Sequence, residues 1–339
     1  MNGGLAAGGD DLVVRDLSTI YATSHGQIVA VRDVSVTVAP GEAVGIVGES
    51  GCGKTALALA LVGLLPRNGR IAAGEVMLGD IDLASAGSKV LRTIRGRRIA
   101  IVFQDSMTSL DPVMPIGRQI TEGLIEHLGL SRKQARVRAA ELLTEVGVPE
   151  AGRRLRQFPH QLSGGLRQRA AIAVAIAVNP DVLIADEPTT ALDVTIQAQL
   201  LDLLERECRQ RGMSLILITH DLGVVASVTD RILVMYAGRV VESGTTGVVF
   251  ADPRHPYTVA LLDSMPRLDA TLRDRLQAIP GTPPTGYAEL AGCPFAPRCG
   301  QVMDRCRAEM PALEMVTGGP EGHHAACFAD MTTAPRSPA

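Results

Sequence analysis

The sequence predicts an α/β fold with a mixed β core, and three observations carry that prediction. The segment from Leu12 to about Val38 alternates apolar and polar residues, as antiparallel strands with one covered face do. A short apolar run, Gly45-Ile46-Val47, leads through a glycine-rich loop into a helical pattern from Lys54 to Leu65. Further along, apolar runs alternate with helical patterns, which indicates βαβ units and parallel strands.

The elements follow one another in a regular order over the first 250 residues. A turn at Pro40-Gly41 ends the alternating segment, and Pro66 stops the first helix. Ile99 to Phe103 reads as a strand, and residues 105–178 are predicted to be mostly helical, with a helix start at Ser131. The remaining predicted elements are a strand over Val182–Ala185, a helix over Ile196–Gln210, a strand over Leu215–Thr219, and a hairpin joining Ile232–Met235 to Arg239–Glu242.

The composition of the chain changes near residue 250, where prolines become frequent and four of the six cysteines follow. We therefore predict a main domain over residues 11–250, with a helical subdomain at about 105–178, and an extension over residues 251–331. Residues 1–10 are expected to be a flexible start and residues 332–339 a disordered tail. No internal repeat is visible, so the main domain occurs once.

Charge and composition exclude several classes of partner. The net charge of −3 gives no general attraction to nucleic acid or to an anionic membrane, and the absence of Trp argues against a base-stacking surface. A local cluster, Arg92 to Arg98, is explained better by a solvated hairpin than by a binding patch. No run of about 20 apolar residues occurs, and Met1 to Asp10 lacks a secretory pattern. We expect a cytoplasmic protein that can dock on a membrane partner.

An eight-residue pattern between the strand at residue 47 and the following helix predicts a phosphate-binding loop. We call it the phosphate loop, and its residues are Gly48, Glu49, Ser50, Gly51, Cys52, Gly53, Lys54 and Thr55. Its glycines allow backbone N–H groups to converge on the phosphates of ATP, Lys54 adds a positive charge, and the Thr55 hydroxyl can ligate Mg²⁺. Cys52 is either an activated thiol at a helix start or, as we favour, a tolerated loop position.

Two carboxylates, Asp186 and Glu187, follow the predicted strand Val182–Ala185. Because neighbouring residues at a strand end point in different directions, Asp186 can hold Mg²⁺ while Glu187 accepts a proton from the attacking water. The alternative is a helix-capping pair before Pro188. The two motifs together indicate nucleotide hydrolysis.

The segment Leu162-Ser163-Gly164-Gly165-Leu166-Arg167-Gln168-Arg169 resembles the signature of ATP-binding cassette (ABC) ATPases. The resemblance implies a P-loop NTPase fold of the ABC type, with an antiparallel β subdomain and a helical subdomain. It also implies head-to-tail dimers, in which Ser163, Gly164 and Gly165 contact the ATP held by the partner subunit. A polar, glycine-bearing helix start suits such an anionic ligand.

Four further positions match motifs of this family. The resemblance implies that Gln104 contacts Mg²⁺ and the attacking water, and that His220 senses the γ-phosphate. Asp193, in Thr190-Ala191-Leu192-Asp193, corresponds to the loop that contacts the opposing subunit, and Tyr21 to the aromatic residue that stacks on adenine. The alternative for Tyr21 is an ordinary aromatic on a sheet face.

Two segments narrow the resemblance to ATPase subunits of oligopeptide and dipeptide permeases. They are the stretch from Gln104 to Pro112 and the stretch from Pro253 to Leu262, and the apolar Leu166 is also common in that subfamily. The resemblance implies an importer ATPase on the cytoplasmic face of the inner membrane. Its partners would be a second ATPase subunit, identical or different, two transmembrane permease subunits and an extracytoplasmic solute-binding protein.

Two other functions stay open at this point. The cargo could be another small solute such as nickel or glutathione, because the ATPase of such a system does not contact it. A soluble cassette ATPase in translation or DNA repair is less favoured, since the chain shows neither a second cassette nor a long coiled-coil insert.

The extension carries a candidate metal site. Its ligands would be Cys293, Cys299, Cys306 and Cys327, and five, six and twenty residues separate them in turn. In a cytosolic chain, four thiols suit either zinc or an iron–sulfur cluster rather than disulfides. We favour a four-iron, four-sulfur cluster over zinc, because the spacing lacks the CxxC pairs usual in zinc ribbons and the resembling dipeptide permease subunits have a C-terminal cluster of this kind. Unliganded thiols are the third alternative. We expect the bound metal to stabilise the extension. His323 and His324 are alternative ligands.

Overall fold

The computed structural model describes residues 9–24, 26–104, 109–190, 193–265, 279–284 and 291–331. Residues 1–8 of the predicted flexible start, and the whole predicted tail over residues 332–339, therefore lie outside the described residues. Contacts between residues divide the chain into two compact units. The first comprises Met1–Val13, Thr37–Ala43 and Met77–Leu217, and the second comprises Val14–Val36, Val44–Val76 and Ile218–Ala339.

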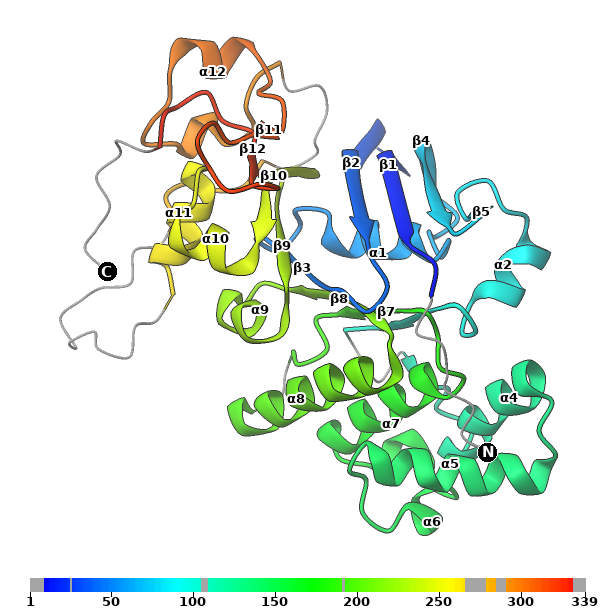
Figure 1. The fold of residues 1–339 in the computed structure, drawn as a ribbon. Coiled ribbons are helices and arrows are strands. Elements are labelled where there is room, and N and C mark those ends of the chain that lie inside the picture. Colours follow the sequence, from blue (N-terminus) through cyan, green and yellow to red (C-terminus); the bar gives the residue numbers. More distant parts are fainter. Residues whose placement is uncertain are drawn as a thin grey trace. The chain divides into compact units, whose positions relative to one another are not determined.

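The first unit combines three strands of parallel sheet with a group of helices (Figure 1). Its elements are β5 (Ile81–Asp82), α2 (Ser88–Ile94), β6 (Ile99–Val102), α4 (Ile116–Leu128), α5 (Arg132–Glu145), α6 (Ala151–Arg154), η1 (Pro159–Gln161), α7 (Gly164–Ile176), β7 (Val182–Asp186), α8 (Val194–Arg211) and most of β8 (Ser214–Thr219). Its strand order is β8-β7-β6, and β6 runs parallel to β7 with Ile99 opposite Val182.

Local sequence signals explain the borders of these helices. Ser131 and Gln134 form a reciprocal capping box at the start of α5, which satisfies two backbone N–H groups that the helix itself cannot. Gly129 and Gly212 end α4 and α8 in the left-handed conformation that glycine adopts without strain. The predicted helical region is thus confirmed where it is described, and residues 105–108 lie outside the described part of the chain.

Buried apolar side chains hold the first unit together. All five residues of β7 are buried, as expected for a parallel strand covered on both faces. The helices contribute small and aliphatic residues at helical spacing, among them Ile116, Ile120 and Leu124 of α4. The arginine-rich segment is a helix followed by a turn rather than a hairpin, and Arg98 pairs with Asp181 at 2.7 Å and with Asp10 at 2.6 Å.

The second unit contains the antiparallel strands of the N-terminal region and everything after β8. Its elements are most of β1 (Leu12–Thr23), β2 (Gly26–Val38) and β4 (Gly69–Leu78), with β3 (Ala43–Val47), α1 (Lys54–Leu61), α9 (Leu222–Val228), β9 (Arg231–Tyr236), β10 (Arg239–Thr245), α10 (Thr246–Ala251), α11 (Pro256–Asp263), η2 (Ala296–Arg298), α12 (Asp304–Ala308), β11 (Glu314–Met315) and β12 (His324–Ala325). One set of strands runs β2-β1-β4 and the other β11-β12-β10-β9-β3.

Helix α1 is shorter than the sequence predicts. It ends at Leu61 rather than Leu65, because Gly63 turns the chain in the left-handed conformation and the Leu64 N–H closes onto the Leu59 carbonyl at 2.7 Å. The predicted hairpin is confirmed: β9 and β10 are antiparallel, and both turn residues, Ala237 and Gly238, have positive φ.

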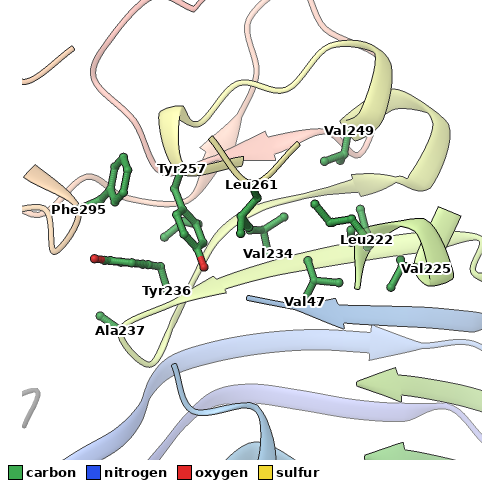
Figure 2. Close-up of a cluster of buried hydrophobic side chains, with 12 residues drawn as sticks. Val47, Leu222, Val225, Val234, Tyr236, Ala237, Val249, Tyr257, Leu261 and Phe295 are labelled. Atoms are coloured by element: carbon green, nitrogen blue, oxygen red, sulfur yellow. The ribbon is translucent and has the colours of Figure 1, made fainter. Parts of the chain in front are cut away.

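The extension shares its core with the preceding strands. Strand β12 pairs with β10, with Ser243 opposite His324. Tyr257 and Phe295 of the extension pack with Tyr236 of β9 in one buried cluster, with Tyr236 and Tyr257 ring centres 4.6 Å apart (Figure 2). Aromatic rings of this size bury a large apolar area. The extension is therefore held to β9 and β10 by backbone pairing and by a common hydrophobic core.

Candidate functional site

The phosphate loop lies between β3 and α1 in the second unit, as the sequence predicts. Gly48 and Gly53 have φ of 155° and 108°, and a Cβ atom on them would come within 2.2 Å of the Met235 oxygen and 2.3 Å of the Ala30 oxygen. No side chain fits at that distance. These two glycines are therefore required by the path of the loop, which turns its backbone toward the start of α1.

Lys54 is buried at the first position of α1, with 5% of the residue exposed. Its ammonium donates to the Gly48 carbonyl at 2.7 Å and to the Glu49 carbonyl at 3.1 Å, so it bridges the start of the loop. A charge held in this way, beside loop N–H groups at a helix start, is suited to the phosphates of a nucleotide. Thr55 follows with an exposed side chain.

Cys52 is buried within the same loop. Burial raises the pKa of its thiol, and the nearby Lys54 charge lowers it by less. A thiol in this state is a poor nucleophile, since the thiolate is the reactive form. The structure thus supports the interpretation of Cys52 as a packed loop position rather than an activated thiol.

The carboxylate segment, Asp186 to Thr190, lies at the end of β7 in the first unit. Asp186 is the last residue of the strand and is 2% exposed. Glu187 has φ of 45°, a left-handed conformation that costs a non-glycine residue about 1 to 3 kcal/mol and is concentrated at functional sites. The backbone strain at Glu187 agrees with a functional position, and the separate roles of Asp186 and Glu187 stay a prediction.

Gln104 and Glu187 are brought together although 83 residues separate them. The Gln104 amide donates to Glu187 Oε2 at 2.8 Å, and the Thr190 hydroxyl donates to the same oxygen at 3.0 Å. Gln104 and Thr190 are both exposed, whereas Glu187 is half-buried. Two predicted catalytic residues therefore form one hydrogen-bonded group in the first unit.

The signature segment opens helix α7. The Ser163 side chain caps the helix by accepting from the Leu166 N–H at 3.4 Å, and Gly164 and Gly165 form the first turn. Ser163 is exposed and Leu166 is half-buried. The predicted helix start is confirmed; its contact with a partner's nucleotide stays a prediction.

The remaining predicted residues occupy loop ends and a strand. Asp193 caps α8 by accepting from the Ile196 N–H at 3.0 Å. His220 follows β8 and is exposed, in the second unit. The Tyr21 ring lies against Gly69, where an added Cβ would meet it at 2.9 Å, so this face of the ring packs on β4. Adenine stacking by Tyr21 stays a prediction.

Of the four extension cysteines, Cys306 is buried and the other three are half-buried. Cys293 and Cys299 flank η2, Cys306 lies in α12, and the Cys293 N–H donates to the Cys306 carbonyl at 2.8 Å. Burial raises the pKa of Cys293 and Cys299, and raises that of Cys327 to about 11, with the neighbouring thiols adding to the increase at each. Across the described part of the chain, no group of three or more His, Cys, Asp or Glu is arranged to hold a metal ion.

Of the two alternative histidine ligands, His323 is engaged elsewhere, and the Nδ1 of His324 lies 3.0 Å from the Gly322 oxygen. His323 is 1% exposed, and its Nε2 contacts Glu242 Oε1 at 2.8 Å. Glu242 also accepts from the backbone N–H groups of Arg254 and His255. His323 therefore joins β10 to the extension, and the prediction that it replaces a cysteine as a metal ligand gains no support.

Sequence reasoning missed two residues that contact the phosphate loop. Arg298 pairs with the Glu49 carboxylate, and the Tyr257 hydroxyl accepts from the Glu49 N–H. Each lies in a segment that the sequence did single out, Arg298 between two of the cysteines and Tyr257 in the stretch from Pro253 to Leu262. The missing signal was their partner, which is more than 200 residues away in each case.

Comparisons with known proteins show which families this chain resembles. A sequence model described as ABC transporter matches residues 31–190, and one described as the C-terminal region of oligopeptide/dipeptide transporters matches residues 241–306. The latter range includes Tyr257, Arg298 and three of the four extension cysteines.

Relatives match over nearly the whole chain. A putative peptide import ATP-binding protein of Brucella melitensis is 52% identical, over 90% of this chain and 94% of its own length. The dipeptide transport ATP-binding protein DppD of Bacillus subtilis is 48% identical, over 88% of this chain and 90% of its own length. A dimeric ATP-binding cassette, solved in a post-hydrolysis state bound to ADP and Pi, is 30% identical with a TM-score of 0.63, over 69% of this chain and 98% of that chain.

The similarity extends from the phosphate loop through the signature to the extension, and the predicted fold class is confirmed. The chain belongs to the ABC transporter family of ATP-binding proteins, in the group that carries the oligopeptide/dipeptide transporter C-terminal region.

Proposed function

We propose that this chain is the ATP-hydrolysing subunit of an importer that takes up dipeptides or oligopeptides through separate membrane subunits. The observation that carries the proposal is the combination of a complete phosphate loop with the C-terminal region found in peptide transporters. The relatives named for peptide import support the cargo. Nickel, glutathione and a soluble non-transport role have no comparable support.

The residues divide the reaction between binding and water activation. The phosphate loop backbone and Lys54 hold the β- and γ-phosphates, and Glu187 accepts the proton of the attacking water. Gln104 orients the Glu187 carboxylate through the 2.8 Å hydrogen bond. His220 contacts the γ-phosphate once ATP is bound.

Mg²⁺ suits the donor set of the predicted site, because hydroxyl and carboxylate oxygens are the ligands it prefers. Thr55, Gln104 and Asp186 would hold it, and the ion would neutralise charge on the phosphates. Asp186, which is nearly fully buried, is the anionic member of this set.

The signature segment serves a second subunit. In this proposal Ser163, Gly164, Gly165 and Asp193 complete the ATP site of a partner ATPase, which is either identical or a related chain. The cap that Ser163 provides leaves the N-terminal end of α7 as a positive dipole end with free N–H groups, which favours a phosphate.

Membrane attachment would come from other chains. Among the described residues, no helix has both the length and the apolar character needed to cross a bilayer. We therefore assign transport itself to two transmembrane permease subunits and a solute-binding protein, with this chain docked on the cytoplasmic face.

We further propose that Cys293, Cys299, Cys306 and Cys327 hold a four-iron, four-sulfur cluster, with zinc as the alternative. The support is the donor set: four thiols in one short extension, of which Cys306 is buried and the other three are half-buried. Bound metal would cross-link α12 and the segments beside it. Iron and acid-labile sulfide in anaerobically purified protein would support the cluster, while stoichiometric zinc without iron would reject it.

The function is tested on the complex purified from membranes by a tag on this chain. We expect a permease pair, a second ATPase subunit and a solute-binding protein to copurify, and ATP hydrolysis in proteoliposomes to rise when peptide-loaded binding protein is added. Stimulation by nickel or glutathione instead of peptides would change the cargo. Recovery with ribosomes or nucleic acid, and no permease, would reject the transport role.

A further inference from the structure

Arg298 of the extension binds the side chain of one residue in the phosphate loop, Glu49. Arg298 Nη1 donates to Glu49 Oε2 at 2.6 Å, and Arg298 Nη2 donates to Glu49 Oε1 at 3.0 Å. The pairing is bidentate, the geometry in which a guanidinium binds a carboxylate most strongly. The Arg298 side chain is 4% exposed and that of Glu49 25%, so the pair is largely shielded from water.

Arg298 itself is held rigidly. Its other donors reach the Pro280 carbonyl at 2.8 Å, the Ile279 carbonyl at 3.3 Å and the Tyr236 hydroxyl at 3.2 Å. The guanidinium also lies within 6 Å of the ring centres of Tyr236 and Phe295. All five N–H donors of an arginine are thereby used, which fixes the position of the charge. Pairing with Glu49 holds the pKa of Arg298 above its ordinary value.

The extension also forms a hydrogen bond with the backbone of Glu49. The Glu49 N–H donates to the Tyr257 hydroxyl at 2.8 Å, and Tyr257 is fully buried in α11. Its ring packs against the rings of Tyr236 and Phe295 (Figure 2). Burial raises the pKa of Tyr257, so the phenol stays neutral and accepts this hydrogen bond at physiological pH.

Glu49 in turn connects to the ligand-binding lysine. The Glu49 carbonyl accepts from Lys54 Nζ at 3.1 Å. Glu49 also brings a negative charge into a loop that binds anionic phosphates, and an uncompensated carboxylate there would repel them. Arg298 cancels that charge. The extension therefore both shapes the loop and removes an electrostatic obstacle to nucleotide binding.

We propose that Arg298 and Tyr257 are positioning residues for ATP, through which the extension sets the affinity of the phosphate loop. The proposal rests on the proposed ATPase function and adds a role for the extension that neither the phosphate loop nor the cysteines imply. Because linkage is reciprocal, ATP binding should also stabilise the segment from Cys293 to Cys299 that carries Arg298.

The test uses Arg298→Gln, Glu49→Gln and the double variant in the purified complex, with the Kd of ATP, KM, kcat and melting temperature measured for each. We expect Arg298→Gln to weaken ATP binding roughly tenfold, as the loss of a charged hydrogen bond would, with kcat changed less than about twofold. Glu49→Gln removes the repelling carboxylate, so the double variant should bind ATP more tightly than Arg298→Gln alone. A merely structural contact would not show this rescue.

Two further variants keep the test decisive. Tyr257→Phe retains the buried ring and removes only the hydroxyl, and it should raise the Kd of ATP by about threefold or more. Arg305→Gln breaks an exposed ion pair with Glu309 in the same extension and should leave the Kd unchanged. If Arg298→Gln does not fold, Tyr257→Phe carries the result.

Two outcomes would overturn the inference: an unchanged Kd in Arg298→Gln and Tyr257→Phe, or equal weakening in Arg298→Gln and the double variant. A wild-type complex that binds no ATP and hydrolyses none would instead reject the proposed function. The two failures are thus distinguishable in one set of measurements.

Discussion

The phosphate loop and the carboxylate segment differ in what holds them. The partners of Glu49 in the loop are buried: Tyr257 is fully buried and the Arg298 side chain is 4% exposed. Two side chains that hydrogen-bond to Glu187 in the carboxylate segment, those of Gln104 and Thr190, are exposed. Contacts to buried, packed groups are costly to break, whereas contacts to exposed side chains rearrange easily. These contacts therefore hold the phosphate loop more rigidly than they hold the carboxylate segment.

We expect the largest effect on activity from a change in the carboxylate segment. Glu187→Gln keeps the shape of the side chain and its hydrogen bonds but removes the proposed proton acceptor, so kcat should fall roughly a hundredfold or more while ATP still binds. ATP hydrolysis and nucleotide binding by the complex measure the two separately. Glu205→Gln, which breaks an ion pair with Arg209 on α8, is the matched control. Normal hydrolysis by Glu187→Gln would remove Glu187 from catalysis.

On the rigid side, Gly53→Ala should unfold the loop. The added Cβ would meet the Ala30 oxygen at 2.3 Å at a φ of 108°. We expect the free energy of unfolding to fall by about 3 kcal/mol or more, together with loss of ATP binding. Gly41→Ala also has positive φ but meets open space, and should cost only about 1 to 2 kcal/mol. Equal effects in denaturant unfolding would show that the close approach does not matter.

Acid should weaken the buried support of the loop. His255 starts the helix that carries Tyr257, and burial lowers its pKa to about 3 from an ordinary 6.5. Because the pKa of His255 is lower in the folded state, protons bind preferentially to the unfolded chain. The free energy of unfolding therefore keeps its full value above about pH 6.5 and decreases as the pH falls below it. By pH 5 this group alone should lower the free energy of unfolding by about 2 kcal/mol. Urea unfolding at several pH values measures this for the wild type and for His255→Asn, whose side chain can still cap the helix. The free energy of unfolding should change less with pH in the variant. Parallel slopes would contradict the assignment.

The smallest effect concerns Gln104. Gln104→Ala removes one hydrogen bond from Glu187, and we expect kcat to fall about tenfold with little change in melting temperature, because the side chain is exposed. Thr190→Val removes the other hydrogen bond and should act in the same direction. A large fall in melting temperature in either variant would show that these hydrogen bonds hold the fold. The carboxylate segment would then not differ from the phosphate loop in rigidity.

Much of the fold was predictable because its signals are local. The capping box at Ser131, the positive φ pair Ala237-Gly238 and the glycines of the phosphate loop each act within a few residues. The end of α1 was predicted four residues late, since the apolar pattern continues past Gly63, whose left-handed turn ends the helix. The predicted boundary near residue 250 was not tested. Strand β12 returns to pair with β10, which composition could not indicate.

The sequence by itself determined the chemistry of this protein: a phosphate loop, a strand ending in two carboxylates, and a signature at a helix start. These depend on residue type and short spacing, because residues a few positions apart determine the local backbone conformation. Only the tertiary structure decided which side chains support them. Gln104 reaches Glu187 across 83 residues, and Tyr257 and Arg298 reach Glu49 across 208 and 249. The first contact follows from the parallel pairing of β6 with β7, and the other two follow from how β9, β10 and the extension pack into a common core. No local pattern encodes either arrangement.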